Sequence, residues 1–183
     1  MLITQRDQQI IDLIELTGAV KTSHIQRLFM KDKSQGKVIA ERRLKSLYSL
    51  GMVHRTRAFI NTEYIYYKKK TLLEHKLALT ELYIALLDLP GEILKFEVEK
   101  QIGDIRPDAL CDYLHRNIEI HLAKSPFNQQ KYEDFYSSGK YREIYKVFPR
   151  VIIVSDRQVD IKASKIRYIK IPLNCSGIYR ILK

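Results

Sequence analysis

The sequence has no long apolar run. Although 45% of its 183 residues are hydrophobic, no stretch approaches the roughly 18 consecutive apolar residues of a membrane-spanning helix. The first residues also lack the basic and then apolar segments of a signal peptide. We therefore expect a cytoplasmic protein without membrane helices, and its apolar content is sufficient for real hydrophobic cores.

Cysteine is scarce, and the motifs of several enzyme classes are missing. Cys111 and Cys175 stand alone, without further Cys or His at zinc-finger spacing, so we expect both to be reduced and packed rather than zinc-bound or disulfide-bonded. There is no glycine-rich phosphate loop, and no serine stands in the context of a hydrolase nucleophile. The five histidines are scattered along the chain, which argues against the histidine-bound metal of a DNA-nicking relaxase.

Positive charge is plentiful and unevenly distributed. The net charge is +11, and residues 1–70 contain 14 Lys and Arg against 6 Asp and Glu, whereas residues 71–183 contain 18 against 15. A positive field attracts polyanions and speeds their encounter, although it does not select a sequence. The bias therefore favours a nucleic acid as the partner of the first 70 residues.

Three helices are predicted at the start of the chain. Thr4 and Asp7 have the spacing of an N-cap residue and its N3 partner before the first helix. After a short connector at 19–21, Thr22 can cap a second helix, and Ser34 can cap a third.

The third helix has one apolar face and one polar face. Four residues are predicted to pack inward: Ala40, Leu44, Leu47 and Tyr48. The opposite side carries donors that can reach phosphates and base edges. The residues expected to contact DNA from this helix and its flanks are Gln35, Lys37, Ile39, Arg42, Arg43 and Lys45.

A β-hairpin is predicted directly after the third helix. Residues 52–57 form one strand, and residues 62–67 return as the second. Arg55 and Arg57 share a face because side chains alternate with a period of two, so both are expected to contact the phosphate backbone. Residues 1–70 as a whole resemble a winged helix-turn-helix, an α+β DNA-binding domain.

A long helix and an α/β layer are predicted after the hairpin. The lysine run at 68–70 marks a boundary, which gives domains 1–70 and 71–183, and the second domain opens with a long helix that ends at Pro90. The remaining predicted elements are strands at 93–98, 108–113, 117–122, 150–154 and 166–171, with a helix at 128–136. We therefore expect an N-terminal α+β domain joined by a long helix to an α/β domain.

Several segments resemble the replication-relaxation family of plasmid and mobile-element proteins. They are TQRDQQIIDLIELTGAVKTSHIQRLF, ERRLKSLYSLGMVHR and LEHKLALTELYIAL in the first half, and RPDAL, IEIHLA, NQQKYEDFY and FPRVIIVSD in the second. The resemblance implies DNA handling on a plasmid, phage or conjugative element. It also implies that the second half adopts a fold similar to PD-(D/E)XK nucleases.

The nuclease resemblance implies specific catalytic residues. In such nucleases an acid after a proline, and an acid followed two positions later by a lysine, bind Mg²⁺ and activate water. Asp108 matches the first acid and Glu119 the second, so both are the implied metal ligands. His121 occupies the lysine position, where it can act as a general base or bind phosphate. Because the lysine is absent, we favour a nuclease-like fold reused for binding or dimerisation.

Three functions compete at this point. The first is a sequence-specific double-stranded DNA-binding protein that needs no cofactor and acts in replication, relaxation or transcriptional control. Its second half then pairs two copies or recruits replication or relaxosome proteins. The second is a Mg²⁺-dependent DNA endonuclease directed by the winged domain, and the third is a protein-interaction module whose basic surface meets an acidic partner. We expect the first.

Overall fold

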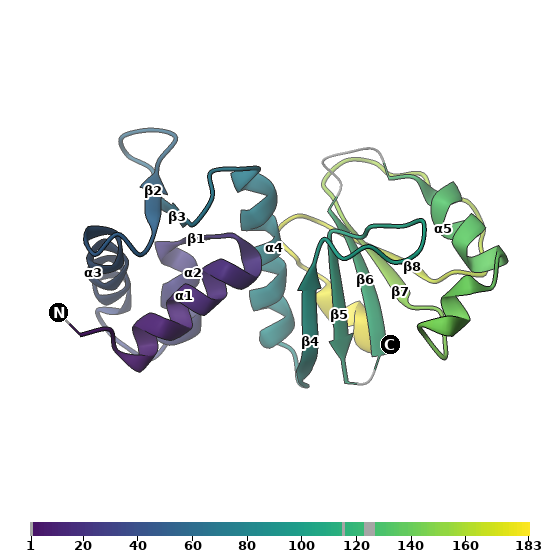
Figure 1. Ribbon diagram of the computed structural model, residues 1–183, viewed down its shortest axis with the longest axis horizontal. Coiled ribbons are helices and arrows are strands. Elements are labelled where there is room, and N and C mark those ends of the chain that lie inside the picture. The colour runs from purple at the N-terminus through teal and green to yellow at the C-terminus, as the bar shows by residue number, and fades with distance from the viewer. Residues whose placement is uncertain (1, 115, 123–126) are drawn as a thin grey trace. The chain divides into compact units, whose positions relative to one another are not determined.

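The computed structural model describes residues 2–114, 116–122 and 127–183, with the backbone alone at 116–117 and 119–122. The chain is mixed α+β and divides into two compact units, Met1–Ile84 and Ala85–Lys183 (Figure 1). Among the described residues, no helix is both long and apolar enough to cross a membrane.

The first unit combines helices with a small antiparallel sheet. Its elements are α1 (Gln5–Thr17), β1 (Ala19–Lys21), α2 (Thr22–Phe29), α3 (Gly36–Ser49), β2 (His54–Thr56), β3 (Ile65–Tyr67) and most of α4 (Leu73–Leu87). The sheet has the order β1-β3-β2. The expected connector at 19–21 is therefore a strand, in which Ala19 pairs with Tyr67 and Lys21 pairs with Ile65. Ala19 and Val20 are fully buried, and a buried backbone needs hydrogen-bond partners that the hairpin supplies.

The starts of the three helices differ slightly from the sequence prediction. Thr4 caps α1, as predicted. The N-cap of α2 is Lys21 instead of Thr22, because β1 runs directly into this helix. The N-cap of α3 is Gln35 instead of Ser34, because a turn closed by the bond from Gly36 N to Lys33 O precedes the helix.

The apolar faces of α1, α2 and α3 form the core of the first unit. Its most deeply buried side chains include Ile10, Ile14, Ile25, Ala40, Leu44 and Leu47. The predicted inward face of α3 is thus confirmed at three of its four positions and wrong at Tyr48, which is 41% exposed. Tyr48 lies about 100° further round the helix than Leu47, and its ring contacts Arg55 of the hairpin.

Polar contacts fix α4 to the helices that precede it. The buried Thr80 hydroxyl lies 2.5 Å from the Ala19 carbonyl oxygen and 2.8 Å from the Thr17 hydroxyl. Glu81 forms ion pairs with His24, at 3.3 Å, and with Arg27. These contacts explain why the division between the units falls after Ile84 and not at the expected boundary of 70/71.

We expect Thr80→Val to lower the free energy of unfolding by about 1–3 kcal/mol. The substitution keeps the shape of the side chain but removes a hydrogen-bond partner from a buried carbonyl and a buried hydroxyl. Urea unfolding followed by circular dichroism measures the change, with the exposed Thr71→Val as the matched control. Equal midpoints for the two variants would contradict the assignment.

Glu81 makes the stability of the first unit depend on pH. The hydrogen bond from His24, reinforced by Arg27, lowers the pKa of Glu81 from 4.5 to about 2. Its stabilisation is complete above the ordinary pKa and is lost as the pH falls toward the folded-state pKa. We expect the stability difference between wild type and Glu81→Gln to shrink by about 1–2 kcal/mol from about pH 5 to about pH 2.5. Urea unfolding at both pH values tests this, and a constant difference would refute it.

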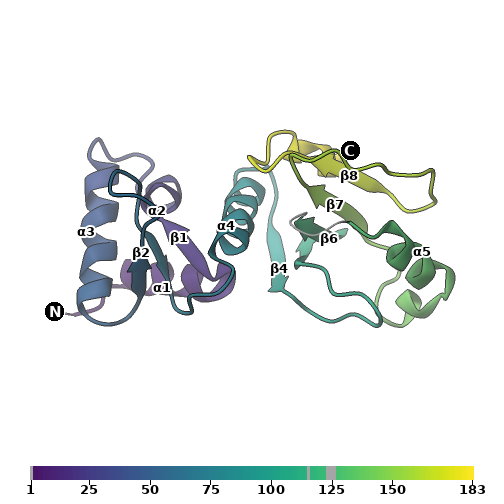
Figure 2. The same cartoon turned by 90° about the horizontal axis from the view of Figure 1, so that it is seen from above.

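The second unit is built on one five-stranded sheet. Its elements are β4 (Ile93–Val98), β5 (Ala109–Tyr113), β6 (Arg116–Leu122), α5 (Gln129–Ser137), the 3₁₀ helix η1 (Lys140–Glu143), β7 (Arg150–Val154), β8 (Tyr168–Ile171) and the 3₁₀ helix η2 (Ile178–Leu182). The strand order is β4-β5-β6-β7-β8, antiparallel up to β6 and parallel from there on (Figure 1). Figure 2 shows the same sheet from above, with β4, β6, β7 and β8 labelled. The predicted strands and helix are present, and the last strand begins at Tyr168 instead of residue 166.

The sheet of the second unit is buried on both faces at its centre. Residues 151–154 of β7 are fully buried, as their continuous apolar run predicted. Val151 and Ile153 pack with Phe135 of α5 in one hydrophobic cluster. Cys111 and Cys175 are free and buried, as predicted, and burial raises the pKa of the Cys111 thiol to about 12.

Candidate nucleic-acid interface

Helix α3 presents a row of cations to solvent. Lys37, Arg42 and Lys45 are exposed, and none of them forms an ion pair within the described part of the chain. They lie within about 140° of one another round the helix. Glu41 lies between the two lysines on the same exposed side. We call Lys37, Arg42 and Lys45 the α3 cations.

Two other residues predicted to contact DNA from α3 instead anchor the helix. Ile39 is half-buried and packs against the hydrophobic core. Arg43 Nη1 lies 3.2 Å from Oδ2 of Asp7, a carboxylate that is only 6% exposed. Gln35 is exposed at the N-cap, where its carbonyl accepts a hydrogen bond from the Ile39 N–H at 3.0 Å. No local signal in the sequence indicates the Arg43 contact, because Asp7 lies 36 residues earlier and its burial is a property of the fold.

Arg55 of strand β2 is held between two tyrosine rings. Its guanidinium carbon lies 4.3 Å from the ring centroid of Tyr48 and 4.3 Å from that of Tyr64. It also donates a hydrogen bond to Tyr66, a residue whose pKa is raised by burial. Each cation–π contact contributes roughly 0.5–1 kcal/mol at an exposed site. Sequence reasoning found Arg55 but missed the tyrosines that position it.

The tip of the β2–β3 hairpin is ordered by side-chain bonds. Arg57 lies 4.9 Å from the Tyr64 ring and donates a hydrogen bond to the Ile60 carbonyl at 2.7 Å. The predicted common face of Arg55 and Arg57 is therefore confirmed, since both contact Tyr64. Phe59 and Ile60 at the tip are 75% and 79% exposed.

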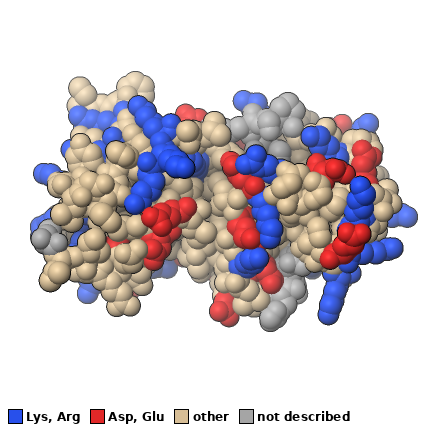
Figure 3. All heavy atoms as spheres, viewed as in Figure 1, with Lys and Arg blue, Asp and Glu red and all other residues tan. Residues whose placement is uncertain are grey.

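Helix α3 and the hairpin border one groove. It has a volume of about 420 Å³ and is lined by Glu41 and Lys45 from α3, by Arg55 and Tyr66 from the hairpin strands, and by Thr22, Thr62, Glu63 and Tyr64. The fold thus brings together the two elements that the sequence assigned to one binding surface. On the face seen in Figure 3, a large group of Lys and Arg atoms lies on the upper part of the first unit, whereas both signs are interspersed on the second unit.

The predicted nuclease residues lie close together in the second unit's chain order. Asp108 is half-buried directly before β5, and Leu110 of β5 pairs with Glu119 of β6. The backbone therefore places Glu119 on β6 and Asp108 at the residue that precedes the neighbouring strand, not on that strand as predicted. The side chains of Glu119 and His121 lie outside the described residues. Among the side chains that are described, no three His, Cys, Asp or Glu gather as a metal site.

Comparison with known proteins gives little further information. No protein-family model matches the sequence, and no curated protein matches it. One solved structure that aligns is the crystal structure of protein VC1899 from Vibrio cholerae, with 12% identity and a TM-score of 0.33, over 85% of this chain and 43% of that one. The chain therefore spans less than half the length of that protein. Membership of the replication-relaxation family stays a prediction.

Proposed function

We propose that the first unit is a winged helix-turn-helix domain that binds double-stranded DNA. In this proposal α3 enters the major groove, and the β2–β3 hairpin is the wing that contacts the backbone. The element order of the first unit, with its β1-β3-β2 sheet, supports the proposal. The observation that carries it is the row of exposed α3 cations without ion-pair partners in the described chain, beside a hairpin that holds two more arginines.

The contacts behind this surface favour binding by preorganisation. The Arg43–Asp7 ion pair and the buried apolar face of α3 fix the helix that carries the α3 cations. The tyrosine rings around Arg55 limit its rotamers before DNA arrives, which lowers the entropy cost of association. Glu41 supplies an acceptor suited to the amino group of cytosine, so this side of the helix can read bases as well as phosphates.

We further propose that the second unit is a nuclease-like α/β domain that serves binding, not cleavage. Three antiparallel strands followed by a helical crossover to a parallel strand support this assignment. A fold does not carry its chemistry with it. In our proposal this unit pairs two copies of the chain, or recruits replication or relaxosome proteins, on a plasmid, phage or conjugative element.

Fluorescence anisotropy with labelled duplex DNA tests the proposed DNA binding. Affinity should fall steeply with salt, because each neutralised phosphate contributes about −0.9 to the slope of log K against log salt. Polyglutamate of matched charge is the control for an acidic protein partner. Tighter binding to polyglutamate than to duplex DNA would replace the DNA proposal with the interaction-module alternative.

Sequencing of the DNA fragments that the protein retains in its own cell distinguishes the biological roles. Enrichment at a replication or transfer origin is the result we expect for a replication-relaxation protein. Enrichment at a promoter would instead assign transcriptional control.

A metal-dependent nuclease is the second candidate, favoured by an acid at position 108, directly before β5, and another at position 119 of the adjacent strand β6. If it is correct, the purified protein with Mg²⁺ or Mn²⁺ cleaves DNA, and Glu119→Ala abolishes cleavage. Single-stranded, duplex and supercoiled substrates should all be tested. Failure to cleave any of them would eliminate this candidate.

A further inference from the structure

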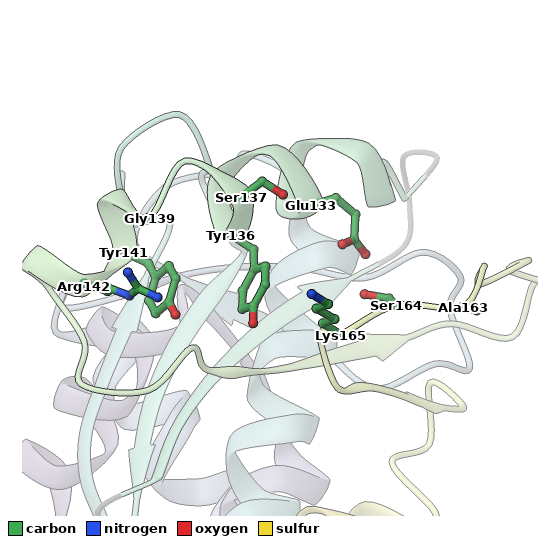
Figure 4. Close-up of a pocket in the computed structure, with 9 residues that line it drawn as sticks. All are labelled: Glu133, Tyr136, Ser137, Gly139, Tyr141, Arg142, Ala163, Ser164 and Lys165. Atoms are coloured by element: carbon green, nitrogen blue, oxygen red, sulfur yellow. The ribbon is translucent and has the colours of Figure 1, made fainter.

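The second unit contains an open pocket that the proposed function does not use. It has a volume of about 840 Å³ and lies between the end of α5, the η1 helix and residues 163–165 (Figure 4). Pockets for small ligands and cofactors typically measure about 300–1,000 Å³. The pocket is therefore large enough for one nucleotide.

Hydrogen bonds hold one wall of the pocket in place. Gln129 of α5 donates to the Lys162 carbonyl at 3.0 Å and accepts from the Lys162 N–H at 2.9 Å. Glu133 accepts hydrogen bonds from Tyr168 and from Gln129, each at 3.1 Å. These bonds fasten the segment that carries Ser164 and Lys165 to α5. They also occupy the Glu133 carboxylate, the one acid among the residues that line the pocket.

An aromatic stack forms the centre of the pocket. The rings of Tyr136 and Tyr141 are 5.5 Å apart and tilted by only 6°. Phe148 packs edge-on against both rings, at 5.3 Å and 5.1 Å. In Figure 4, Tyr136 lies between Tyr141 and Lys165, and its hydroxyl points into the pocket. Contacts with Tyr141 and Phe148 thus fix the orientation of the Tyr136 ring, as the stacking of a base on this ring requires.

Two cations flank this stack. Arg142 and Lys165 are exposed, and neither forms an ion pair within the residues that the structure describes. The Arg142 guanidinium carbon lies 5.7 Å from the centroid of the Tyr141 ring. Ser137 adds a hydroxyl group to the lining, whereas the Ser164 hydroxyl is hydrogen-bonded to Glu133. The pocket therefore combines a ring platform and two cations, which are the groups that recognise a base and its phosphate.

We propose that this pocket binds a nucleotide, with the base stacked on Tyr136 and the phosphate bound by Lys165 and Arg142. A free mononucleotide and a nucleotide of a single DNA strand share this chemistry. The proposal does not depend on the α3 cations, because every residue that carries it belongs to the second unit.

Isothermal titration calorimetry of the full chain tests the proposal. The probes are deoxyadenosine monophosphate, deoxyribose 5-phosphate and a single-stranded oligothymidine of about eight nucleotides, which matches a small single-strand site. We expect deoxyadenosine monophosphate to bind at least about 10-fold more tightly than deoxyribose 5-phosphate, because the base adds stacking. Equal affinity for these two probes, or no binding of any probe, would overturn the proposal. Tighter binding of the oligonucleotide supports a DNA strand as the source, and tighter binding of the mononucleotide supports a free nucleotide.

Point variants test whether nucleotide binding depends on the residues that line this pocket. Lys165→Gln changes an exposed side chain and should weaken nucleotide binding about 10-fold, whereas the exposed Lys146→Gln should leave it unchanged. Tyr136→Leu should weaken binding to a similar extent by removing the platform, and circular dichroism checks its folding. Unchanged binding in Lys165→Gln would overturn the proposal even if Tyr136→Leu fails to fold. Substitution of the α3 cations should not affect nucleotide binding, so this test and that of duplex binding can fail independently.

Discussion

Replacing the three α3 cations, in the variant Lys37→Gln, Arg42→Gln, Lys45→Gln, should weaken duplex DNA binding about 100- to 1,000-fold at about 0.1 M salt. All three are exposed without ion pairs in the described chain, so their removal leaves no internal charge uncompensated. Each lost phosphate contact also lowers the salt dependence, and we expect the slope of log K against log salt to become shallower by about 3. Anisotropy titrations over a range of salt concentrations measure both quantities.

A matched variant distinguishes direct DNA contact by the α3 cations from attraction of DNA by the net positive charge of the chain. Lys131→Gln, Lys146→Gln, Lys162→Gln removes the same charge from exposed positions of the second unit. This variant should lose far less affinity, because long-range steering mainly changes the association rate and is screened by salt. Equal losses in the two triple variants would show that net charge alone governs binding, and would contradict a specific role for α3.

Asp7→Ala should lower the free energy of unfolding of the first unit by about 2–4 kcal/mol. Asp7 accepts hydrogen bonds from the Thr4 N–H at 2.9 Å and from the Thr4 hydroxyl at 2.7 Å, and it pairs with Arg43 at 3.2 Å. The substitution removes half of the capping box, which costs about 1 kcal/mol. It also leaves Arg43 without its partner at a half-buried position, and breaking such a pair by deleting one member adds a comparable or larger cost.

Urea unfolding of Asp7→Ala and Asp12→Ala tests this role. Asp12 is an exposed acid of the same helix whose side chain accepts a bond from Gln8 at 2.8 Å, and its removal should change stability by no more than about 0.5 kcal/mol. Similar losses in both variants would contradict the anchoring role of Asp7.

Arg43→Gln should likewise destabilise the fold. Under conditions where both proteins are folded, its affinity for duplex DNA should stay within about threefold of the wild-type affinity.

Local signals in the sequence predicted most of the secondary structure. The capping box at Thr4 and the apolar periods of α1 and α3 each lie within a few residues, so one window contains the whole pattern. The strands of the second unit were found in the same way, from alternation and from the continuous apolar run of β7. Strand β1 was missed because three residues carry no detectable period, and its strand character depends on pairing with the distant β3.

The sequence predicted the types of residue at the candidate interface more accurately than the role of each residue. Lysines and arginines on α3 were visible in the sequence, but which of them is free depends on tertiary partners. Arg43 is tied to Asp7, which lies 36 residues earlier, and Arg55 depends on Tyr48 and Tyr64 from two other segments. The same limit applies to Tyr48, because a helical wheel cannot tell a core aromatic from one that packs on a neighbouring hairpin.

The most direct test of DNA binding by α3 is an NMR titration of the isotope-labelled chain with duplex DNA. Amide shifts concentrated in residues 36–49 and in the hairpin at 54–62 are the predicted result, with the largest changes around Arg42 and Arg57. Shifts confined to residues 85–183, or no shifts at protein and DNA concentrations of about 0.1 mM, where even non-specific complexes form, would contradict it.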